Sequence, residues 1–150
     1  MIILDSSFFF TDIPLNEKAL IPPSVLCELK DFRSKCRFDT LSQNMVSVES
    51  PSAESLALAR KGAEKTKDIT VLSETDLDVI ALAIEKKAGL ATDDFAVSNT
   101  AQYLGIKVNP IQQRRPSVRK WKYRCSGCGR YAKDSGICDV CGSEIKRKLK

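Results

Sequence analysis

The chain of 150 residues is 43% hydrophobic and 29% charged, which is typical of a globular protein with one ordinary core and room for a small appended module. No apolar run approaches the roughly 18 residues of a membrane helix, and the start of the chain lacks a basic targeting segment, so we expect a cytoplasmic protein. The sequence contains no His. This excludes Ser-His and Cys-His catalysis and leaves carboxylates, lysines, thiols or metal ions to carry any chemistry.

The charges are divided unevenly along the chain. Residues 1–111 contain 12 Lys and Arg against 16 Asp and Glu, a net charge of −4, whereas residues 112–150 contain 12 against 3, a net charge of +9. An acidic body with a basic tail indicates a metal ion on the first part and a polyanion on the second.

Strand and helix patterns alternate along the first part of the chain. The apolar start ends at Asp5 and fits a buried strand, and Pro22 and Pro23 are typical of a first helical turn. The expected strands are 1–4, 45–50, 89–92 and 106–111, and the expected helices are 22–34, 51–68, 73–89 and 95–105. Ser73 and Asp76 have capping-box spacing, and Gly89 is expected to end their helix. The alternation predicts an α/β fold with a central parallel sheet flanked by helices.

Acidic residues recur where the predicted strands end. Asp5 follows the first strand, Asp93 and Asp94 follow a later one, and Asp76 opens a helix that enters from the same side. Glu28, about one turn into its helix, can lean inward. Because ligands of an open parallel sheet bind at the carboxyl ends of its strands, we expect these acids to converge. Gathered carboxylates need cations, and oxygen ligands suit Mg²⁺ or Mn²⁺.

Each acid also has a purely structural explanation. Asp5 can cap the turn after it, Asp94 can cap the next helix, and Asp76 can serve only as the capping partner of Ser73. Glu28 can be a solvent-facing charge. These alternatives stay open for each acid alone, but their order at strand ends favours a shared site.

Four segments carry a family resemblance: ILDSS, VLCEL, LSETDLDVIALA and LATDDFAV. In this order they resemble the PIN-domain nucleases, a compact α/β family whose acids bind Mg²⁺ or Mn²⁺ and cleave RNA. The resemblance covers about residues 1–111 and implies that the catalytic acids are Asp5, Glu28, Asp76 and Asp93, with Asp5, Asp76 and Asp93 as metal ligands. It also implies a supporting acid at Asp94 and a hydroxyl at Ser6 or Ser7 beside the first acid. Metal-activated water would then attack the phosphate and leave 5′-phosphate and 3′-hydroxyl products.

The C-terminal segment 125–150 contains two CxxC pairs, each followed by Gly. The spacing Cys125-x2-Cys128, nine residues, Cys138-x2-Cys141 predicts a zinc ribbon whose four thiolates close a structural Zn²⁺ site. Metal binding would supply the folding energy of so short a segment. A redox pair or disulfides are the alternatives. Cys27 and Cys36 lie outside the pattern and are interpreted as ordinary thiols.

Basic and aromatic residues surround the cysteines, and residues 112–124 are expected to form a basic linker. Basic groups neutralise phosphates and aromatic faces stack on unpaired bases, which favours binding of single-stranded or looped RNA. The candidate RNA-binding residues are Arg114, Arg115, Arg119, Lys120, Trp121, Lys122, Tyr123, Arg130 and Lys133. The alternatives are a solubilising tail and, for Trp121, packing of the ribbon.

A PIN-like body followed by a zinc ribbon resembles the endonucleases that trim the 3′ end of small-subunit rRNA during ribosome biogenesis in archaea and eukaryotes. This resemblance implies a precursor rRNA substrate, and as partners the pre-small-subunit particle and a KH-domain assembly factor. Two other functions stay open: a toxin-like PIN ribonuclease that acts on other RNAs, and a non-catalytic RNA-binding assembly factor.

Overall fold

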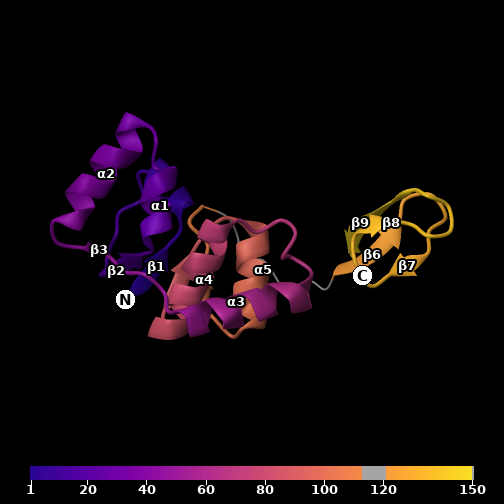
Figure 1. Cartoon of the computed structure of the whole chain (residues 1–150). Coiled ribbons are helices and arrows are strands. Elements are labelled where there is room, and N and C mark those ends of the chain that lie inside the picture. Colours follow the sequence, from indigo (N-terminus) through magenta and orange to yellow (C-terminus); the bar gives the residue numbers. More distant parts are fainter. Residues whose placement is uncertain (113–120, 150) are drawn as a thin grey trace. The chain divides into compact units, whose positions relative to one another are not determined.

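The computed structural model describes residues 1–112 and 121–149 (Figure 1). The chain divides into two compact units, Met1–Val118 and Arg119–Lys150. Each unit contains its own sheet, five-stranded in the first and four-stranded in the second. No helix in the described ranges is both long and apolar enough to cross a membrane.

The first unit has a parallel sheet with the strand order β3-β2-β1-β4-β5. Its strands are β1 (Ile2–Leu4), β2 (Ala19–Ile21), β3 (Val46–Val48), β4 (Gly89–Ala91) and β5 (Val108–Asn109). Its helices are the 3₁₀ helix η1 (Ser6–Phe10), α1 (Pro23–Glu28), α2 (Phe32–Ser42), α3 (Ala53–Thr66), α4 (Glu74–Lys86) and α5 (Phe95–Tyr103). The predicted α/β fold with a central parallel sheet is confirmed.

The strand order makes β1 and β4 the place where the chain changes direction across the sheet. From β1 the chain moves to β2 and β3 on one side, and it then returns through β4 to β5 on the other side. The two central strands are joined in register, with Ile3 beside Leu90, and the Asp5 N–H donates to the Ala91 carbonyl at 3.1 Å. The carboxyl ends of β1 and β4 therefore form the switch point at which open α/β sheets bind ligands.

Buried aliphatic side chains join the sheet to the helices. Ile3, Leu4 and Leu90 are fully buried in the two central strands, and the run Val79–Ala83 of α4 is buried throughout. Helix α3 packs on α4 and α5 (Figure 1). A core of this kind holds the carboxyl ends of β1 and β4 rigidly in place.

The helix expected at 22–34 is two helices. Helix α1 ends at Glu28, where the Leu29 N–H bonds the Leu26 carbonyl, and Asp31 then starts α2 by accepting a bond from the Ser34 N–H at 2.8 Å. Asp31 has an extended backbone, as an N-cap requires, and this separates the two helices. The prediction of one continuous helix was wrong because it missed this cap.

Two further details differ from the sequence prediction. Helix α4 ends at Lys86 and is capped by Lys87, which adopts a left-handed conformation with φ 50°, and Gly89 belongs to strand β4 instead of ending the helix. Strand β2 was not predicted. It has only three residues, Ala19–Ile21, and is followed directly by the two prolines that open α1, so no alternation is long enough to reveal it.

The second unit is an antiparallel sheet with the strand order β7-β6-β9-β8. Its strands are β6 (Trp121–Cys125), β7 (Tyr131–Ala132), β8 (Gly136–Ile137) and β9 (Glu144–Leu149). Whereas the sequence predicts a linker as far as residue 124, β6 already begins at Trp121 and pairs with β9 along its length.

Candidate active site

Asp5 lies at the carboxyl end of β1 and is 5% exposed. Its carboxylate accepts hydrogen bonds from the Ser6 N–H at 2.6 Å, the Ser7 hydroxyl at 3.0 Å and the Thr92 hydroxyl at 2.8 Å. Burial raises the pKa of Asp5 above its ordinary value and the charge of Glu28 adds to this, while the three hydrogen bonds oppose it. Asp5 is therefore a buried carboxylate in a fixed orientation, and a nearby cation would favour its charged form.

Asp76 forms the predicted capping box with Ser73 at the start of α4. The N–H and hydroxyl of Ser73 donate to Oδ2 of Asp76 at 2.7 and 2.8 Å, and the Asp76 N–H donates back to Ser73 Oγ at 3.1 Å. Oδ1 of Asp76 has no hydrogen-bond partner among the described residues. Burial raises the pKa of Asp76, and the charges of Asp5 and Asp94 raise it further. Capping and metal binding are thus compatible, because they use different oxygen atoms.

Asp93 is turned toward the chain that follows β5. Its Oδ1 accepts hydrogen bonds from the backbone N–H groups of Ile111 at 2.9 Å and Gln112 at 3.1 Å. It is not among the charges that act most strongly on Asp5 or Asp76. In this position Asp93 fastens the segment after β5 to the end of β4.

Asp94 is the N-cap of α5 and belongs to the acidic neighbourhood. Its Oδ1 accepts a bond from the Val97 N–H at 3.0 Å, which leaves Oδ2 without a hydrogen-bond partner among the described residues. Its charge raises the pKa of Asp76. The geometry therefore favours Asp94 over Asp93 as the acid that β4 contributes to the site.

Glu28 is the last residue of α1, and its charge acts on Asp5. Helix α1 is held to α4 by a bond from the Ser24 hydroxyl to Asp78 at 2.6 Å. Sequence reasoning gave Asp78 no part in the site. Through Ser24 it fixes the helix that ends at Glu28, which is a positioning role.

Thr92 is the second residue that sequence reasoning missed. It is fully buried, donates its hydroxyl to Asp5 Oδ2 at 2.8 Å and accepts a bond from the Asp94 N–H at 3.0 Å. One hydroxyl thus connects an acid after β1 to an acid after β4. The position of Thr92 between an apolar strand and two aspartates could have indicated this role from the sequence.

We expect Thr92→Val to lower the RNA cleavage that the family resemblance implies by about 10- to 100-fold, because it loses the hydroxyl that orients Asp5. It should also lower the free energy of unfolding by about 1 to 3 kcal/mol, because the buried Asp94 N–H loses its acceptor. The lost donor lowers the pKa of Asp5, so its removal should raise that pKa and make the loss greater at mildly acidic than at mildly alkaline pH. Rates for Thr92→Val and Thr92→Ser over a pH series measure this. A Thr92→Ser variant as impaired as Thr92→Val would contradict the hydroxyl's role.

Asp5, Glu28, Asp76 and Asp94 are called the acid group below. The charges acting most strongly on Asp5 and Asp76 are other carboxylates, and in the described part of the chain no Lys or Arg ranks with them. In the whole described part of the chain, only the four ribbon cysteines bring three or more ligand atoms close enough together to hold one metal ion. The acid group is thus a set of mutually repelling carboxylates that are farther apart than the cysteine thiols, and a divalent cation bound by several of them would relieve this repulsion.

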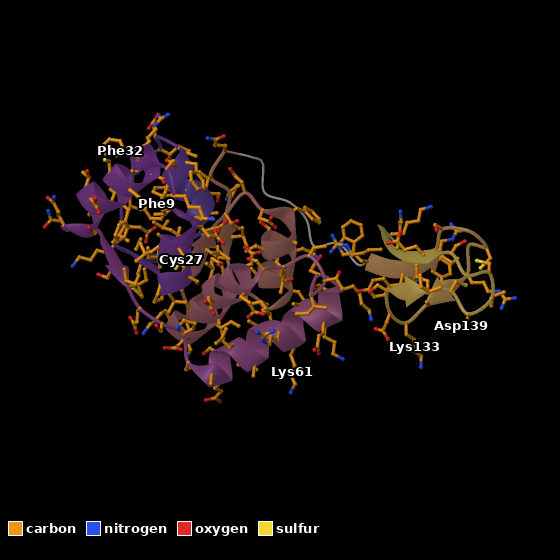
Figure 2. The ribbon with its side chains drawn as sticks, turned by 45° about the horizontal axis from the view of Figure 1, so that its top comes forward. Phe9, Cys27, Phe32, Lys61, Lys133 and Asp139 are labelled. Atoms are coloured by element: carbon orange, nitrogen blue, oxygen red, sulfur yellow. The ribbon has the colours of Figure 1, made fainter. Side chains whose placement is uncertain are left out.

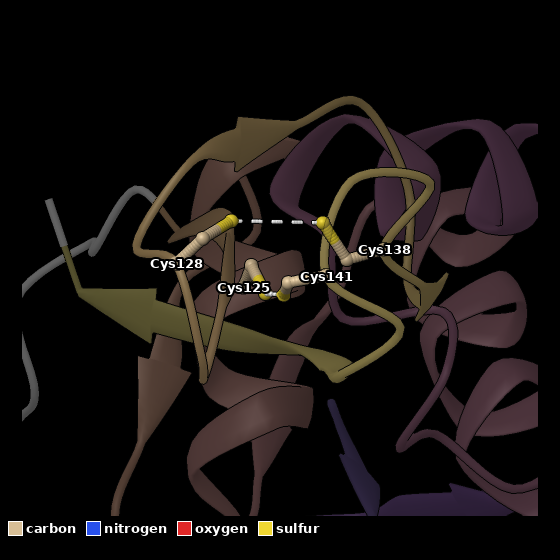
Figure 3. A group of neighbouring side chains, drawn as sticks. All are labelled: Cys125, Cys128, Cys138 and Cys141. Carbon is tan, nitrogen blue, oxygen red and sulfur yellow. Dashed lines mark hydrogen bonds between the residues drawn. The ribbon is translucent and has the colours of Figure 1, made fainter.

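The four ribbon cysteines converge (Figure 3). The Sγ atoms of Cys125, Cys128, Cys138 and Cys141 all lie within 4.8 Å of one another. The Cys125–Cys141 and Cys128–Cys138 pairs are separated by 3.3 and 3.7 Å, close to the edge of about 3.8 Å in a tetrahedron with Zn–S bonds of about 2.3 Å. All four are free thiols rather than disulfides.

The protein environment favours thiolates at part of this cluster. Hydrogen bonds from the hydroxyl and N–H of Ser143 lower the pKa of Cys141 to about 6. The Arg130 N–H also lowers the pKa of Cys128, but burial and the neighbouring thiols outweigh it and raise that pKa to about 11. Four thiolates cannot share this space without a cation, so the cluster fits a metal ion such as Zn²⁺.

The candidate RNA-binding residues are unequal in exposure. Lys122, Arg130 and Lys133 are exposed. Tyr123 is 4% exposed, so little of its ring is accessible to RNA in this structure, and its role as an RNA contact stays a prediction. Trp121 is half-buried with the Arg147 guanidinium 4.4 Å from its ring centre, which covers one face. The predictions for Arg114, Arg115, Arg119 and Lys120 lie outside the described residues.

A parallel sheet with carboxylates at its switch point gives the first unit a candidate ligand site at the edge where open α/β sheets bind their ligands. Residues 2–85 match the family described as the PIN domain of ribonuclease. The crystal structure of VapBC2 from Rickettsia felis bound to a DNA fragment from their promoter has the same fold, with a TM-score of 0.54 and 17% identity over 73% of this chain and 98% of that chain.

Two relatives with similar sequences show which PIN-domain ribonucleases this chain resembles. The chain is 40% identical to Endoribonuclease Nob1 of Pyrococcus abyssi over 97% of this chain and 91% of the relative. It is 38% identical to Ribonuclease VapC1 of Thermoplasma acidophilum over 89% of this chain and 69% of that relative. The chain therefore belongs to the PIN-domain ribonuclease family, and within it to the Nob1 endoribonucleases.

Proposed function

We propose that this endoribonuclease cleaves the precursor of small-subunit rRNA at its 3′ end during ribosome biogenesis. The observation that carries the proposal is the combination of an acid group at the switch point with a separate basic ribbon on the same chain. The similarity to Nob1 along nearly the whole chain, ribbon included, supports it.

The acid group holds Mg²⁺ or Mn²⁺ in this proposal. Asp5 is fixed by Ser6, Ser7 and Thr92, while Asp76 and Asp94 each direct one carboxylate oxygen away from their helix caps. A bound divalent cation supplies a water molecule of lowered pKa and neutralises charge on the phosphate. Hydrolysis then leaves a 5′ phosphate and a 3′ hydroxyl.

The ribbon holds Zn²⁺ and binds RNA through one face of its sheet. In the β6–β9 ladder Lys122 lies opposite Lys148, and Arg124 lies opposite Lys146. Like charges directly opposite each other destabilise a sheet, so this face is suited to a polyanion. Arg124, Lys146 and Lys148 also line a groove of about 540 Å³. Phosphates of single-stranded or looped RNA fit such a surface.

Replacing Lys148 by Ala is expected to weaken RNA binding several-fold and to reduce the slope of log K against log salt concentration by about 0.7 to 1, because one phosphate contact is lost. Lys61→Ala is the matched control, since Lys61 is an exposed lysine on α3 in the other unit (Figure 2). Equal salt slopes for the two variants would exclude this face as the RNA surface.

The proposed partners are the pre-small-subunit particle and a KH-domain assembly factor, in the cytoplasm. A toxin-like activity is the second candidate function, because the VapC1 relative is also similar over most of this chain. Cleavage of equal amounts of precursor rRNA, mRNA and tRNA separates the two. Preference for the rRNA junction supports the proposal, and indiscriminate cleavage of all three RNAs favours the toxin-like function.

A further inference from the structure

Two Phe side chains near the acid group are exposed instead of buried. Phe32 is 83% exposed and Phe10 is 53% exposed. Phe32 is the first residue of α2, four residues after Glu28, and Phe10 is the last residue of η1, five residues after Asp5. Each ring therefore follows one of the acids closely along the chain.

The topology places both rings at the edge of the sheet where the acids lie. The 3₁₀ helix η1 begins directly after β1, at the carboxyl end of the strand. Helix α2 leads into β3, which is parallel to the other strands, so the start of α2 lies at the carboxyl edge and its end at the opposite edge. With about 2.0 Å of rise per 3₁₀ residue, Phe10 lies about 10 Å from Asp5 along η1.

The core does not use Phe32. Helix α2 packs through Phe38, whose ring is 6.0 Å from that of Phe9, and through Arg37, whose guanidinium lies 4.8 Å from the Phe8 ring centre. Figure 2 shows Phe32 at the periphery and Phe9 within the unit. A ring left in water on a helix that is already anchored has no role in packing.

Basic side chains accompany the exposed rings. Lys30 and Lys35 flank Phe32 along the chain and are exposed, and neither ammonium group has a carboxylate partner among the described residues. Arg33 lies between them and pairs with Asp12. Three basic residues thus lie within seven residues of Glu28 along the chain.

We propose that Phe32 and Phe10 form a stacking platform for unpaired bases of the RNA next to the scissile phosphate, with Lys30 and Lys35 contacting adjacent phosphates. The proposal rests on RNA as the substrate of the acid group. Aromatic faces stack on any base, and cations follow the backbone, which together describe a single-stranded RNA site. In this proposal the platform positions the single-stranded RNA beside the acid group, while the ribbon contributes RNA affinity separately.

The test measures cleavage and binding of a short single-stranded RNA that spans the mature 3′ end of small-subunit rRNA. Phe32→Ala and Phe10→Ala are each expected to raise KM by about tenfold while kcat changes little. The Kd, measured with zinc-loaded protein and no added Mg²⁺ or Mn²⁺ so that the ribbon stays folded, should rise by about the same factor. Phe32→Trp should restore binding and Phe32→Leu should not, because stacking needs an aromatic face. An abasic nucleotide at the stacked position should remove the difference in affinity between the unaltered protein and the Phe32→Ala variant.

Tyr103→Ala is the matched control. Tyr103 is an aromatic residue 49% exposed at the end of α5, the helix that starts at Asp94 and runs away from the acid edge. If the unaltered protein cleaves the RNA but Phe32→Ala and Phe10→Ala bind it as well as Tyr103→Ala does, the stacking platform is wrong. The proposed nuclease function would not be affected by that result. Failure of the unaltered protein to cleave would instead count against the proposed function.

Discussion

Replacing Asp94 by Asn is expected to lower RNA cleavage by on the order of a hundredfold or more, while the protein stays folded. Asn is as good an N-cap as Asp, so α5 keeps its capping bond to the Val97 N–H. The substitution removes the charge that acts on Asp76 and one negative ligand of the proposed metal site. Cleavage rates measured over a metal titration test the loss of activity, and a thermal melt of each protein tests whether the variant stays folded.

Asp93→Asn is the matched control, because it makes the same chemical change one residue earlier. Asp93 accepts bonds from Ile111 and Gln112, which an amide oxygen can also accept, so cleavage should stay within a few-fold of the unaltered rate. The reverse result, with Asp93→Asn inactive and Asp94→Asn active, would return the catalytic role to the residue that the family resemblance selects.

Loss of the four-cysteine site is expected to have a large effect on the folding of the ribbon and on RNA affinity. Cys125→Ser should abolish stoichiometric Zn²⁺ binding and unfold the ribbon, because metal binding contributes on the order of 10 kcal/mol to folding of such sites. RNA affinity should fall at least about tenfold with the basic face gone, and slow metal-dependent cleavage should remain because the acid group belongs to the other unit.

Cys27→Ser controls for the chemical change, since Cys27 is an exposed free thiol outside the cluster. Zinc content by mass spectrometry, RNA binding and cleavage are compared for the two variants. Full zinc content in Cys125→Ser would contradict the four-thiolate site. Complete loss of cleavage in Cys125→Ser, with the first unit still folded, would contradict the separation of binding from catalysis.

Strong local patterns explain what the sequence predicted well. Ser73 with Asp76, followed by the apolar run Val79–Ala83, specifies a capped and buried helix, and the structure has both. The cysteine spacing likewise brought four thiols together, since a CxxC followed by Gly is a local turn. Such features depend on residues that are close in the sequence.

The contacts that distinguish Asp93 from Asp94 depend on residues far along the chain. Asp93 is bound by Ile111 and Gln112 after β5, and Thr92 reaches Asp5 across the central strands. Tertiary pairing decides these orientations, and neighbouring residues do not encode it. The same reason hid strand β2, which exists because it pairs with both β1 and β3.

The central claim is metal-dependent hydrolysis at one junction of ribosomal RNA. The direct measurement incubates the full chain with an RNA that spans the mature 3′ end of small-subunit rRNA, in Mn²⁺, in Mg²⁺ and in EDTA, and identifies the new ends. We predict cleavage at that junction in metal only, with a 3′ hydroxyl and a 5′ phosphate. Tight binding without cleavage in either metal, or a 2′,3′-cyclic phosphate product, would contradict it.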